Sequence, residues 1–338
     1  MDAVAAMDQQ NSTPTQLPPH PSDSLERTQA VRDVAPAPPA SGAKDRPPQQ
    51  YTAGCKWTSA DWSCSYDVVF MSFWTIYEQS SAIWRNDWIQ HAPNWNPPLA
   101  EQFDRLSLLA DSPINATDFT AQFSSCRDHF RDRLSDHNPA LFVRNGCVEA
   151  SASRILEVIF GRESGPYLVQ HLACPHCGRE DQATRGMLLV TRNKVLVPGV
   201  TALLQTLWAS FIQECQSTTS HQKATCSNCQ TQNEIRGVEM PEVPWIWFEW
   251  GEAVLVGPSL TLKFSSPSQQ LTYSLRSIIY TGQNHFTIRF RGKSGQWWKH
   301  DGQIASGAPQ PDNIQSEALL LMNGARPACI YIYRRDDQ

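Results

Sequence analysis

Charged side chains are scarce in this sequence, and long apolar runs are missing from it. Asp, Glu, Lys and Arg make up 18% of the 338 residues and leave a formal net charge of −5. No dense basic patch stands out, so binding of nucleic acid through a charged surface is not expected. No stretch approaches the roughly 18 consecutive apolar residues of a membrane-spanning helix, so we expect no membrane span.

The first ten residues carry no signal for secretion. Met-Asp-Ala-Val-Ala-Ala-Met-Asp-Gln-Gln has neither the basic n-region nor the apolar h-region of a signal peptide. We therefore expect an intracellular protein of the cytoplasm, the nucleus or both. In a reducing compartment the ten cysteines should be free thiols or metal ligands rather than disulfides.

The composition of the chain changes near residue 50. Residues 1–50 are rich in Pro, Gln, Ser, Asp and Ala and hold few large apolar side chains, so they cannot bury enough surface to offset the entropy of ordering. We predict a disordered tail, which serves either as a spacer or as a binding segment for a partner. The remainder is long enough for one large domain or two small ones.

Helical periodicity dominates the chain up to about residue 165, and strand-like patterns are more frequent after it. Val68–Ser80 is apolar on most sides, which predicts a largely buried helix with Cys64 at its start. Helices before an antiparallel sheet indicate an α+β architecture. Further helices are expected at 117–134, 151–161 and 200–215, and strands at 187–191, 245–250, 271–280, 285–290, 296–300 and 328–334.

Two Cys-x-x-Cys motifs lie 48 residues apart. Cys174-Pro-His-Cys177 and Cys226-Ser-Asn-Cys229 place four thiols on two tight turns. Four thiolates match the tetrahedral coordination of Zn²⁺, so we expect a structural zinc ion. The alternative is four reduced cysteines in turns. His176, which lies between two of these cysteines, is expected at the surface.

The other cysteines give weaker signals. Cys126-Arg-Asp-His129 resembles half of a metal site without a second half, so a buried Cys126 and an exposed His129 on one helix are the simpler interpretation. Cys55 is close enough to Cys64 in the sequence to be a rival nucleophile, although Lys-Trp-Thr-Ser follows it instead of a helix. The remaining cysteines are expected to be core or surface thiols: Cys147, Cys215 and Cys329.

Cys64, His285 and Asp301 form a candidate nucleophilic site. Cys64 opens the expected helix, where the field of the helix N-terminus lowers a thiol pKa and a neighbouring imidazole can hold the proton. His285 heads an alternating strand after a turn, and the next strand ends at His300. Asp301 then falls near the level of His285, where its carboxylate can orient the imidazole. His300 should point to the opposite face of its strand, as a surface residue.

The order of these segments resembles the ubiquitin-specific protease family of papain-like deubiquitinases. Pro-Glu-Val-Pro-Trp-Ile-Trp-Phe-Glu-Trp, at 241–250, is similar to a palm strand of that family, and Ala-Cys-Ile-Tyr-Ile-Tyr-Arg-Arg, at 328–335, is similar to its closing strand. The resemblance covers about residues 52–336. It implies Cys64 as the nucleophile, His285 as the general base and Asp301 as the residue that orients it, with a zinc ion held by the four cysteines.

The same resemblance implies a division of the chain. The papain-like fold of the family has a helical thumb, β fingers that bear the zinc ion, and an antiparallel β palm. We expect the thumb at about 51–165, the fingers at about 166–240 and the palm at about 241–338, after the disordered tail at 1–50.

Several positions depart from the family pattern. The family usually has an asparagine five residues before the cysteine as an oxyanion donor, and Ser59 stands there, with Asp61 nearby. A hydroxyl can donate a hydrogen bond but an ionised aspartate cannot. Losing one oxyanion donor costs roughly 100- to 1,000-fold in rate. A second acidic residue often follows the triad aspartate in the family, and here that residue is Gly302.

The segment around the histidine also differs. The usual Gly-His-Tyr is Asn284-His285-Phe286, so the glycine that lets the substrate tail approach is absent. Asn284, Phe286 and Trp298 are candidates for the walls of the substrate-tail channel, while a core role is the alternative for each tryptophan. The departures resemble a divergent branch that includes a SUMO isopeptidase.

The resemblance implies an isopeptidase that hydrolyses the bond after the C-terminal Gly-Gly of ubiquitin or a ubiquitin-like modifier. The altered oxyanion position leaves open a weak or inactive relative that still binds ubiquitin or SUMO, and a zinc-stapled scaffold is a third interpretation. The expected partners are ubiquitin or a SUMO-like modifier and its conjugates, without nucleic acid or membrane. We expect the protein to be a monomer.

Overall fold

The structure is a computed structural model, and all of its described residues belong to one compact unit that spans residues 47–338. None of the helices in the described part of the chain has the length and apolar character needed to cross a membrane. The expected tail at 1–50 and the expected strand at 187–191 lie outside the described residues. The described ranges are 53–58, 62–112, 114–144, 150–160, 167–186, 202–216, 225–240, 242–250, 256–265 and 270–337.

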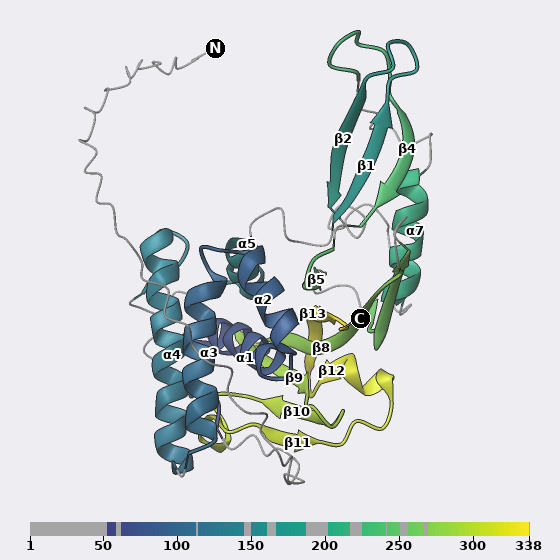
Figure 1. Cartoon of the computed structure of the whole chain (residues 1–338). Helices are drawn as coiled ribbons and strands as arrows, with labels where there is room; N and C mark the ends of the chain where they lie inside the picture. Colours follow the sequence, from purple (N-terminus) through teal and green to yellow (C-terminus); the bar gives the residue numbers. More distant parts are fainter. Residues whose placement is uncertain are drawn as a thin grey trace, which may run out of the picture. The chain divides into compact units, whose positions relative to one another are not determined.

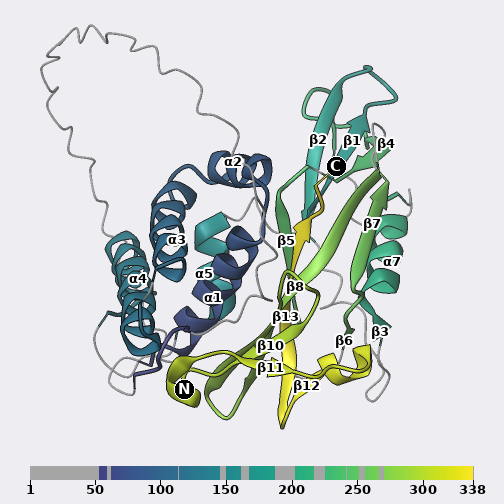
Figure 2. The same ribbon diagram turned by 60° about the horizontal axis from the view of Figure 1, so that its bottom comes forward.

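The N-terminal part of the unit is helical. Helix α1 is its centre, since every residue from Cys64 to Tyr77 is buried. It packs against three other helices of this part and against the neighbouring sheet (Figures 1 and 2). The helices described in this part of the chain are α1 (Cys64–Glu78), α2 (Ala82–His91), α3 (Asn96–Ala110), α4 (Ala116–His137) and α5 (Ala152–Phe160).

Local sequence explains where several of these helices begin. The side chain of Ser81 accepts a hydrogen bond from the Trp84 amide at the start of α2, and Asn115 accepts one from the Asp118 amide at the start of α4. These side-chain oxygens satisfy amides that have no partner within the helix. Helix α3 has proline in its first turn, where no amide hydrogen is needed. Helices α2 and α3 were not among the helices expected from the sequence. In α2 only two tryptophans are buried among polar residues, so this segment has little apolar periodicity.

A large antiparallel sheet forms the second part. β13 (Arg326–Arg335) lies at its centre and also pairs with β5 (Trp245–Glu249), while β7 (Thr261–Ser265) pairs with β8 (Gln270–Gly282). This arrangement of helices and antiparallel strands confirms the expected mixture of α and β structure. The path of strands in spatial order is β11 (Gln310–Asp312), β10 (Trp297–His300), β9 (His285–Arg291), β8 (Gln270–Gly282), β13 (Arg326–Arg335) and β12 (Met322–Asn323).

The sheet has an apolar core on each face. Alternate residues of a strand point to opposite faces, and β13 follows this rule: Ile330 and Ile332 belong to the core around α1, whereas Tyr331 and Tyr333 belong to a second core. The second core includes the buried face of α7 (Leu204–Gln216). The helical part therefore packs on one face of the sheet, where α1 contacts β9.

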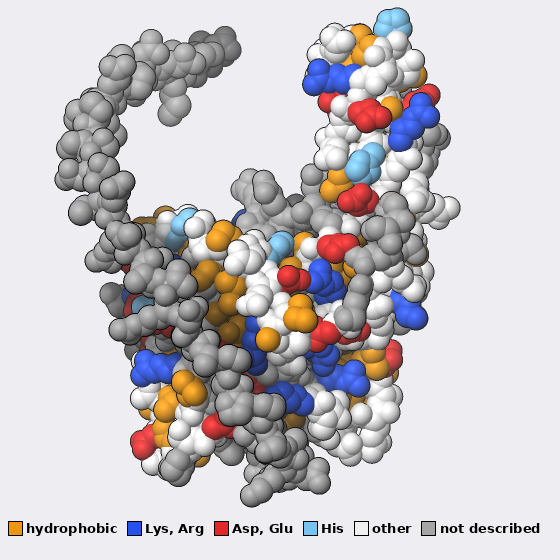
Figure 3. All heavy atoms as spheres, viewed as in Figure 1, with side chains coloured by type: hydrophobic (Ala, Val, Ile, Leu, Met, Phe, Trp, Pro, Cys, Tyr) orange, Lys and Arg blue, Asp and Glu red, His pale blue; other side chains and the backbone are white. Residues whose placement is uncertain are grey.

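A smaller three-stranded antiparallel sheet carries the two Cys-x-x-Cys motifs. Its order is β2 (Glu180–Gly186), β1 (Tyr167–Ala173) and β4 (Glu234–Glu239), and α7 contacts β4 (Figure 1). Basic and acidic side chains are interspersed on the face of it seen in Figure 3. Strands β3 (Ala202–Leu203) and β6 (Val256–Gly257) form a short parallel pair at the start of α7.

Candidate functional site

His285 and Asp301 are joined by a direct contact between their side chains. His285 is the first residue of β9 and Asp301 follows the last residue of β10, and the two strands pair antiparallel. The imidazole Nε2 lies 2.8 Å from Asp301 Oδ1, and the Gln303 amide donates to the same oxygen over 3.0 Å. The side chain of His285 is buried and that of Asp301 is partly buried, with 5% and 16% of their surface exposed. The structure thus brings together two of the three residues that the sequence singled out.

The charge of Asp301 is supported by its neighbours. Burial by itself raises the pKa of this carboxyl, but hydrogen bonds from His285 and Gln303 and the nearby positive charge of Arg326 outweigh it and lower the pKa. Arg326 Nη1 lies 3.9 Å from Asp301 Oδ2. An ionised carboxylate only accepts hydrogen bonds, so the imidazole Nε2 carries the hydrogen and Nδ1 is left to act as a base.

The turn before His285 sets the position of its ring. Gly282 pairs with His285 across the β8–β9 hairpin, and the two residues between them, Gln283 and Asn284, both have φ of 56°. Two left-handed residues are what a type I′ turn requires, and Asn adopts this conformation more readily than most side chains. Asn284 is exposed in this turn. The asparagine can therefore make the turn without the glycine of the family pattern.

Cys64 lies at the N-terminus of α1, as the sequence predicted. It is the first residue of the helix and is 3% exposed. α1 packs against β9, the strand that His285 begins. The free amides at the start of a helix create a positive field that favours a thiolate.

Trp57 connects the segment before α1 with the histidine and the aspartate. Its ring lies edge-on to the imidazole of His285, with centroids 6.4 Å apart. Its amide donates to the carbonyl of Gly302, the residue after Asp301, over 3.1 Å. No motif or periodicity singles out Trp57, because its partners lie more than 200 positions away in the chain.

An ion pair is buried one turn into α1. The carboxylate of Asp67 contacts the guanidinium of Arg127 on α4, and both side chains are almost fully enclosed. Burial raises the pKa of Asp67 to about 6, although Arg127 and the Ser63 hydroxyl act in the opposite direction. Burial alone would lower the pKa of Arg127, but the charge of Asp67 raises it. At neutral pH both groups are therefore charged and paired.

The expectation for His300 was wrong. Its side chain is buried rather than exposed, and Nε2 lies 2.9 Å from the carbonyl oxygen of Cys55. Burial lowers the pKa of His300 to about 4, so the ring is neutral at pH 7. The chain at Gly54 and Cys55 covers this side chain, and a Cβ atom at Gly54 would overlap the imidazole.

The rival nucleophile Cys55 is enclosed in the core. Burial raises the pKa of its thiol well above the usual value, and the negative charge of Asp67 adds to this effect. Such a thiol holds almost no thiolate at neutral pH, and the thiolate is the nucleophilic form.

The remaining candidates around the site have different surroundings. Ser59 and Asp61 lie outside the described residues. Phe286 is partly buried against the core around α1, and Trp298 is 8% exposed within that core. A channel role for Asn284, Phe286 and Trp298 remains a prediction.

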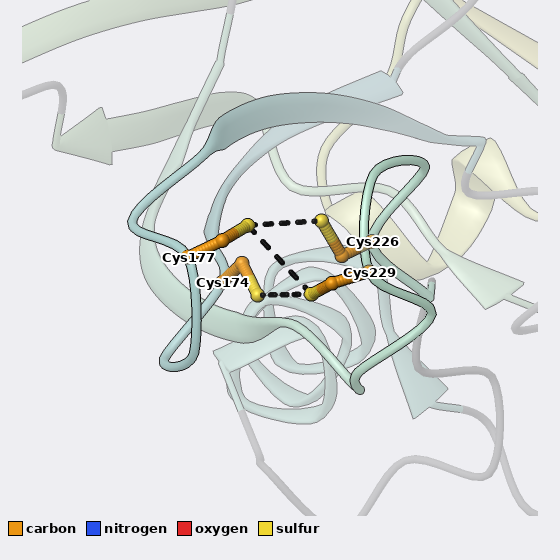
Figure 4. A group of neighbouring side chains, drawn as sticks. All are labelled: Cys174, Cys177, Cys226 and Cys229. Atoms are coloured by element: carbon orange, nitrogen blue, oxygen red, sulfur yellow. Dashed lines mark hydrogen bonds between the residues drawn. The ribbon is translucent and has the colours of Figure 1, made fainter.

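The four cysteines of the two motifs form one cluster (Figure 4). Their sulfur atoms all lie within 4.8 Å of one another. The Sγ–Sγ distances are 3.4 Å for Cys174 and Cys229, 3.6 Å for Cys177 and Cys226, and 3.7 Å for Cys177 and Cys229. A tetrahedral ion with metal–sulfur bonds of about 2.3 Å separates its ligands by about 3.8 Å. The cluster can therefore hold one metal ion.

The two turns of this cluster have the same backbone structure. In each turn, the amide of the first cysteine donates a hydrogen bond to the carbonyl of the fifth residue after it. The carbonyl of the same cysteine accepts a hydrogen bond from the amide of the fourth residue after it. The fourth residue after the first cysteine has positive φ in both turns, 70° at Gly178 and 60° at Gln230. Hydrogen bonds from Thr231 lower the pKa of Cys229 to about 6, which favours the thiolate that a metal binds.

Other predictions from the sequence are confirmed. His176 is exposed on the turn between Cys174 and Cys177. Cys126 is buried and His129 is exposed on α4, which is the burial pattern that was expected for these two residues. No further group of three or more potential metal ligands occurs in the described part of the chain.

Comparisons with known proteins give little beyond this geometry. No family model matches the chain, and no curated protein matches it. Among solved structures, the chain is similar to one from the SAGA deubiquitinase module with Ubp8, Sgf11, Sus1 and Sgf73, at 13% sequence identity and a TM-score of 0.47. The similarity covers 80% of this chain and 67% of that one. It is too slight to support an argument about fold or function.

Proposed function

We propose that this protein is a cysteine isopeptidase of the ubiquitin-specific protease type. It would hydrolyse the bond after the C-terminal Gly-Gly of ubiquitin or a ubiquitin-like modifier such as SUMO. The observation that carries the proposal is the 2.8 Å contact between His285 and Asp301 at the end of a strand that packs on α1, the helix that Cys64 opens.

The proposed reaction begins at the thiol of Cys64. The imidazole of His285 accepts its proton at Nδ1, while Asp301 holds the ring and stabilises the imidazolium. The thiolate adds to the carbonyl carbon of the scissile bond. As the C–N bond breaks, the imidazolium returns the proton to the lysine amine, and a thioester with Cys64 remains. His285 then deprotonates a water molecule, which attacks the thioester, and the proton passes to the thiolate that leaves.

Stabilisation of the oxyanion falls to the start of α1 in this proposal. The backbone amide of Cys64 is one donor, and the hydroxyl of Ser59 is a candidate for the second. Because a serine has one donor where an amide side chain has two, the rate of this enzyme should lie below that of a relative with asparagine.

The metal in the proposal is Zn²⁺ at the four-cysteine cluster. Thiolate ligands in a closed tetrahedral set are typical of structural zinc, which staples two turns and takes no part in the reaction. In this scheme the helices at about 51–165 form a thumb, the strands at about 166–240 form fingers, and the sheet at about 241–338 forms a palm. The partners would be the modifier and its conjugates inside the cell.

The second candidate function is binding of the modifier without catalysis. It is favoured by Ser59, the residue that stands where the family has its oxyanion asparagine. The two functions differ in one property: only the enzyme forms a covalent adduct with a modifier whose C-terminus carries a thiol-reactive group.

The test uses purified, zinc-loaded protein and two such probes, one of ubiquitin and one of SUMO. We expect a stoichiometric adduct with one of them, lost in Cys64→Ala and retained in Cys126→Ala, a control that removes a buried thiol of α4. A labelled Cys64→Ala variant would contradict the assignment of the nucleophile. If the folded wild type labels with neither probe but binds the unmodified modifier, the binding function replaces the enzymatic one.

A further inference from the structure

The charges of the buried pair Asp67 and Arg127 are not explained by the stability of the fold. Its side chains are 2% and 1% exposed, so both ions have lost their water. The loss of hydration often cancels the attraction of such a pair, and two apolar side chains of similar volume are frequently as stable. A role other than stability is therefore worth seeking in its contacts.

One oxygen of Asp67 reaches back to the start of the nucleophile helix. Oδ2 accepts a hydrogen bond of 3.0 Å from the hydroxyl of Ser63, the residue directly before Cys64. The same hydroxyl accepts the amide of Thr58 over 3.3 Å. Through Ser63, the carboxylate thus fixes both the first turn of α1 and the end of the segment that precedes it.

The same oxygen also lies against the turn that follows Asp301. A Cβ atom at Gly302 would stand 3.1 Å from Asp67 Oδ2 and 2.9 Å from the Trp57 amide nitrogen. A side chain at 302 therefore has no room, and the carboxylate of Asp67 lies in the direction in which it would point. The absence of a side chain at Gly302 lets α1 approach the residue that holds His285.

Arg127 extends these contacts to α4. It meets Asp67 Oδ1, donates to Asp128 Oδ1 over 2.9 Å, and its Nη1 lies 3.5 Å from the carbonyl of Lys56. The segment at Lys56 is also held by its own amide, which donates to Ser124 of α4 over 3.2 Å. The ion pair is thus the point at which α1, α4, the segment 56–58 and the Asp301 turn meet.

We propose that Asp67, paired with Arg127, is a positioning residue that holds the first turn of α1 in register with the turn after Asp301. It acts through Ser63 on one side and Gly302 on the other, and touches none of the reacting atoms. Its effect is to set the separation of Cys64 from the His285–Asp301 pair. The expected effect on catalysis rests on the proposed function. The expected effect on the reactivity of the Cys64 thiol does not depend on it.

The expected consequence is specific. A misplacement of about 1 Å between reacting groups costs on the order of 100-fold in rate. Substrate binding far from α1 is unaffected, so kcat should fall while KM stays the same. A thiol that has lost its register with the imidazole also has less thiolate, so Cys64 should react more slowly with a small alkylating reagent.

Two variants separate positioning from stability. Asp67→Leu combined with Arg127→Met replaces the pair by apolar side chains, and so avoids the buried unpaired charge that either single change creates. Ser63→Ala leaves the ion pair intact and removes only its link to the helix start. Ser72→Ala is the matched control, because Ser72 is buried in the same helix and its hydroxyl donates only to Val68 of that helix, over 2.8 Å.

Each variant is measured for thermal stability, for kcat and KM with the modifier that labels the wild type, and for the rate of Cys64 alkylation by iodoacetamide, followed on the Cys64 peptide by mass spectrometry. We expect kcat and the alkylation rate to fall by about tenfold or more in the double variant and several-fold in Ser63→Ala, with KM within about twofold and Ser72→Ala unchanged.

A folded double variant with wild-type kcat and alkylation rate would overturn the proposal, and so would a Ser63→Ala variant equal to Ser72→Ala if the double variant does not fold. The alkylation rate keeps the two proposals apart. If the wild type reacts with no modifier, the proposed function fails, while the comparison of Cys64 alkylation between variants still decides the role of Asp67.

Discussion

The indole ring of Trp57 meets the imidazole of His285 edge-on, with ring centroids 6.4 Å apart and ring planes 85° apart. Trp57 is half-buried, and its backbone is held to Gly302 by a hydrogen bond of 3.1 Å. The ring therefore covers one side of the His285–Asp301 pair and limits the positions that the imidazole can take.

Replacing Trp57 should slow the reaction without weakening substrate binding. An edge-on aromatic contact contributes about 0.5–1.5 kcal/mol, which corresponds to about 2- to 12-fold in rate if it is lost in the transition state. We expect Trp57→Leu to lower kcat by this factor, and Trp57→Phe, which keeps an aromatic ring, to lower it less. Steady-state kinetics with the modifier that labels Cys64 measure both. Equal effects of the two substitutions would speak against a role for the ring contact.

His300 should make the stability of the fold depend on pH. Its pKa of about 4 lies below the 6.5 of an unfolded histidine, so its contribution is present above pH 6.5 and is lost as the pH falls towards 4. Asp67, with a pKa raised to about 6, acts in the opposite sense, because its contribution is present below about pH 4 and is lost as the pH rises through 6. The two effects offset each other in the wild type.

We expect His300→Gln to remove one of these effects. Relative to the wild type, its free energy of unfolding should rise by up to roughly 3 kcal/mol as the pH falls from 6.5 to 4. Urea unfolding at several pH values measures the difference. His129→Gln, which changes an exposed histidine of α4, should follow the wild-type curve. If His300→Gln also follows it, the imidazole is not buried as the structure has it.

Introducing glycine in one turn of the cysteine cluster and removing it from the other should change zinc binding in opposite directions. Gly178 and Gln230 occupy equivalent left-handed positions, and a side chain there costs about 1 kcal/mol relative to glycine. Gln230→Gly should therefore strengthen zinc binding by several-fold, and Gly178→Ala should weaken it by a similar factor. Competition with a chromophoric chelator measures both, and each variant is the control for the other. Metal analysis should give one zinc per chain and none in Cys226→Ser.

The effect of having asparagine rather than glycine directly before His285 can be tested by substitution in the β8–β9 hairpin. Glycine adopts the left-handed conformation of Asn284 without strain, and it removes the exposed side chain that directly precedes His285 in the chain. We expect Asn284→Gly to raise the melting temperature slightly and to speed labelling of Cys64 by the modifier probe, since the tail gains room. Gln283→Gly, at the other left-handed position, should change stability but not labelling. Slower labelling of Asn284→Gly would indicate that the asparagine side chain contacts the substrate.

The local elements of the fold were predictable because their causes lie within a few residues. The apolar pattern of 68–80 predicted α1, and the alternation at 285–290 and 328–334 predicted β9 and β13. The two Cys-x-x-Cys motifs predicted a cluster that the structure contains. In each case neighbouring side chains determine the periodicity or the turn, so no distant contact is needed.

The sequence by itself determined helices α1, α4, α5 and α7, the central strands, the two turns of the cysteine cluster and the pairing of His285 with Asp301, because hydrophobic periodicity and motif spacing are properties of residues close together in the chain. Only the tertiary structure decided that His300 is buried, that Trp57 lies against His285 and that Asp67 pairs with Arg127, 60 positions away. Such contacts depend on which faces of distant elements pack together, and burial then changes the charge and the role of a side chain that looks ordinary in the sequence.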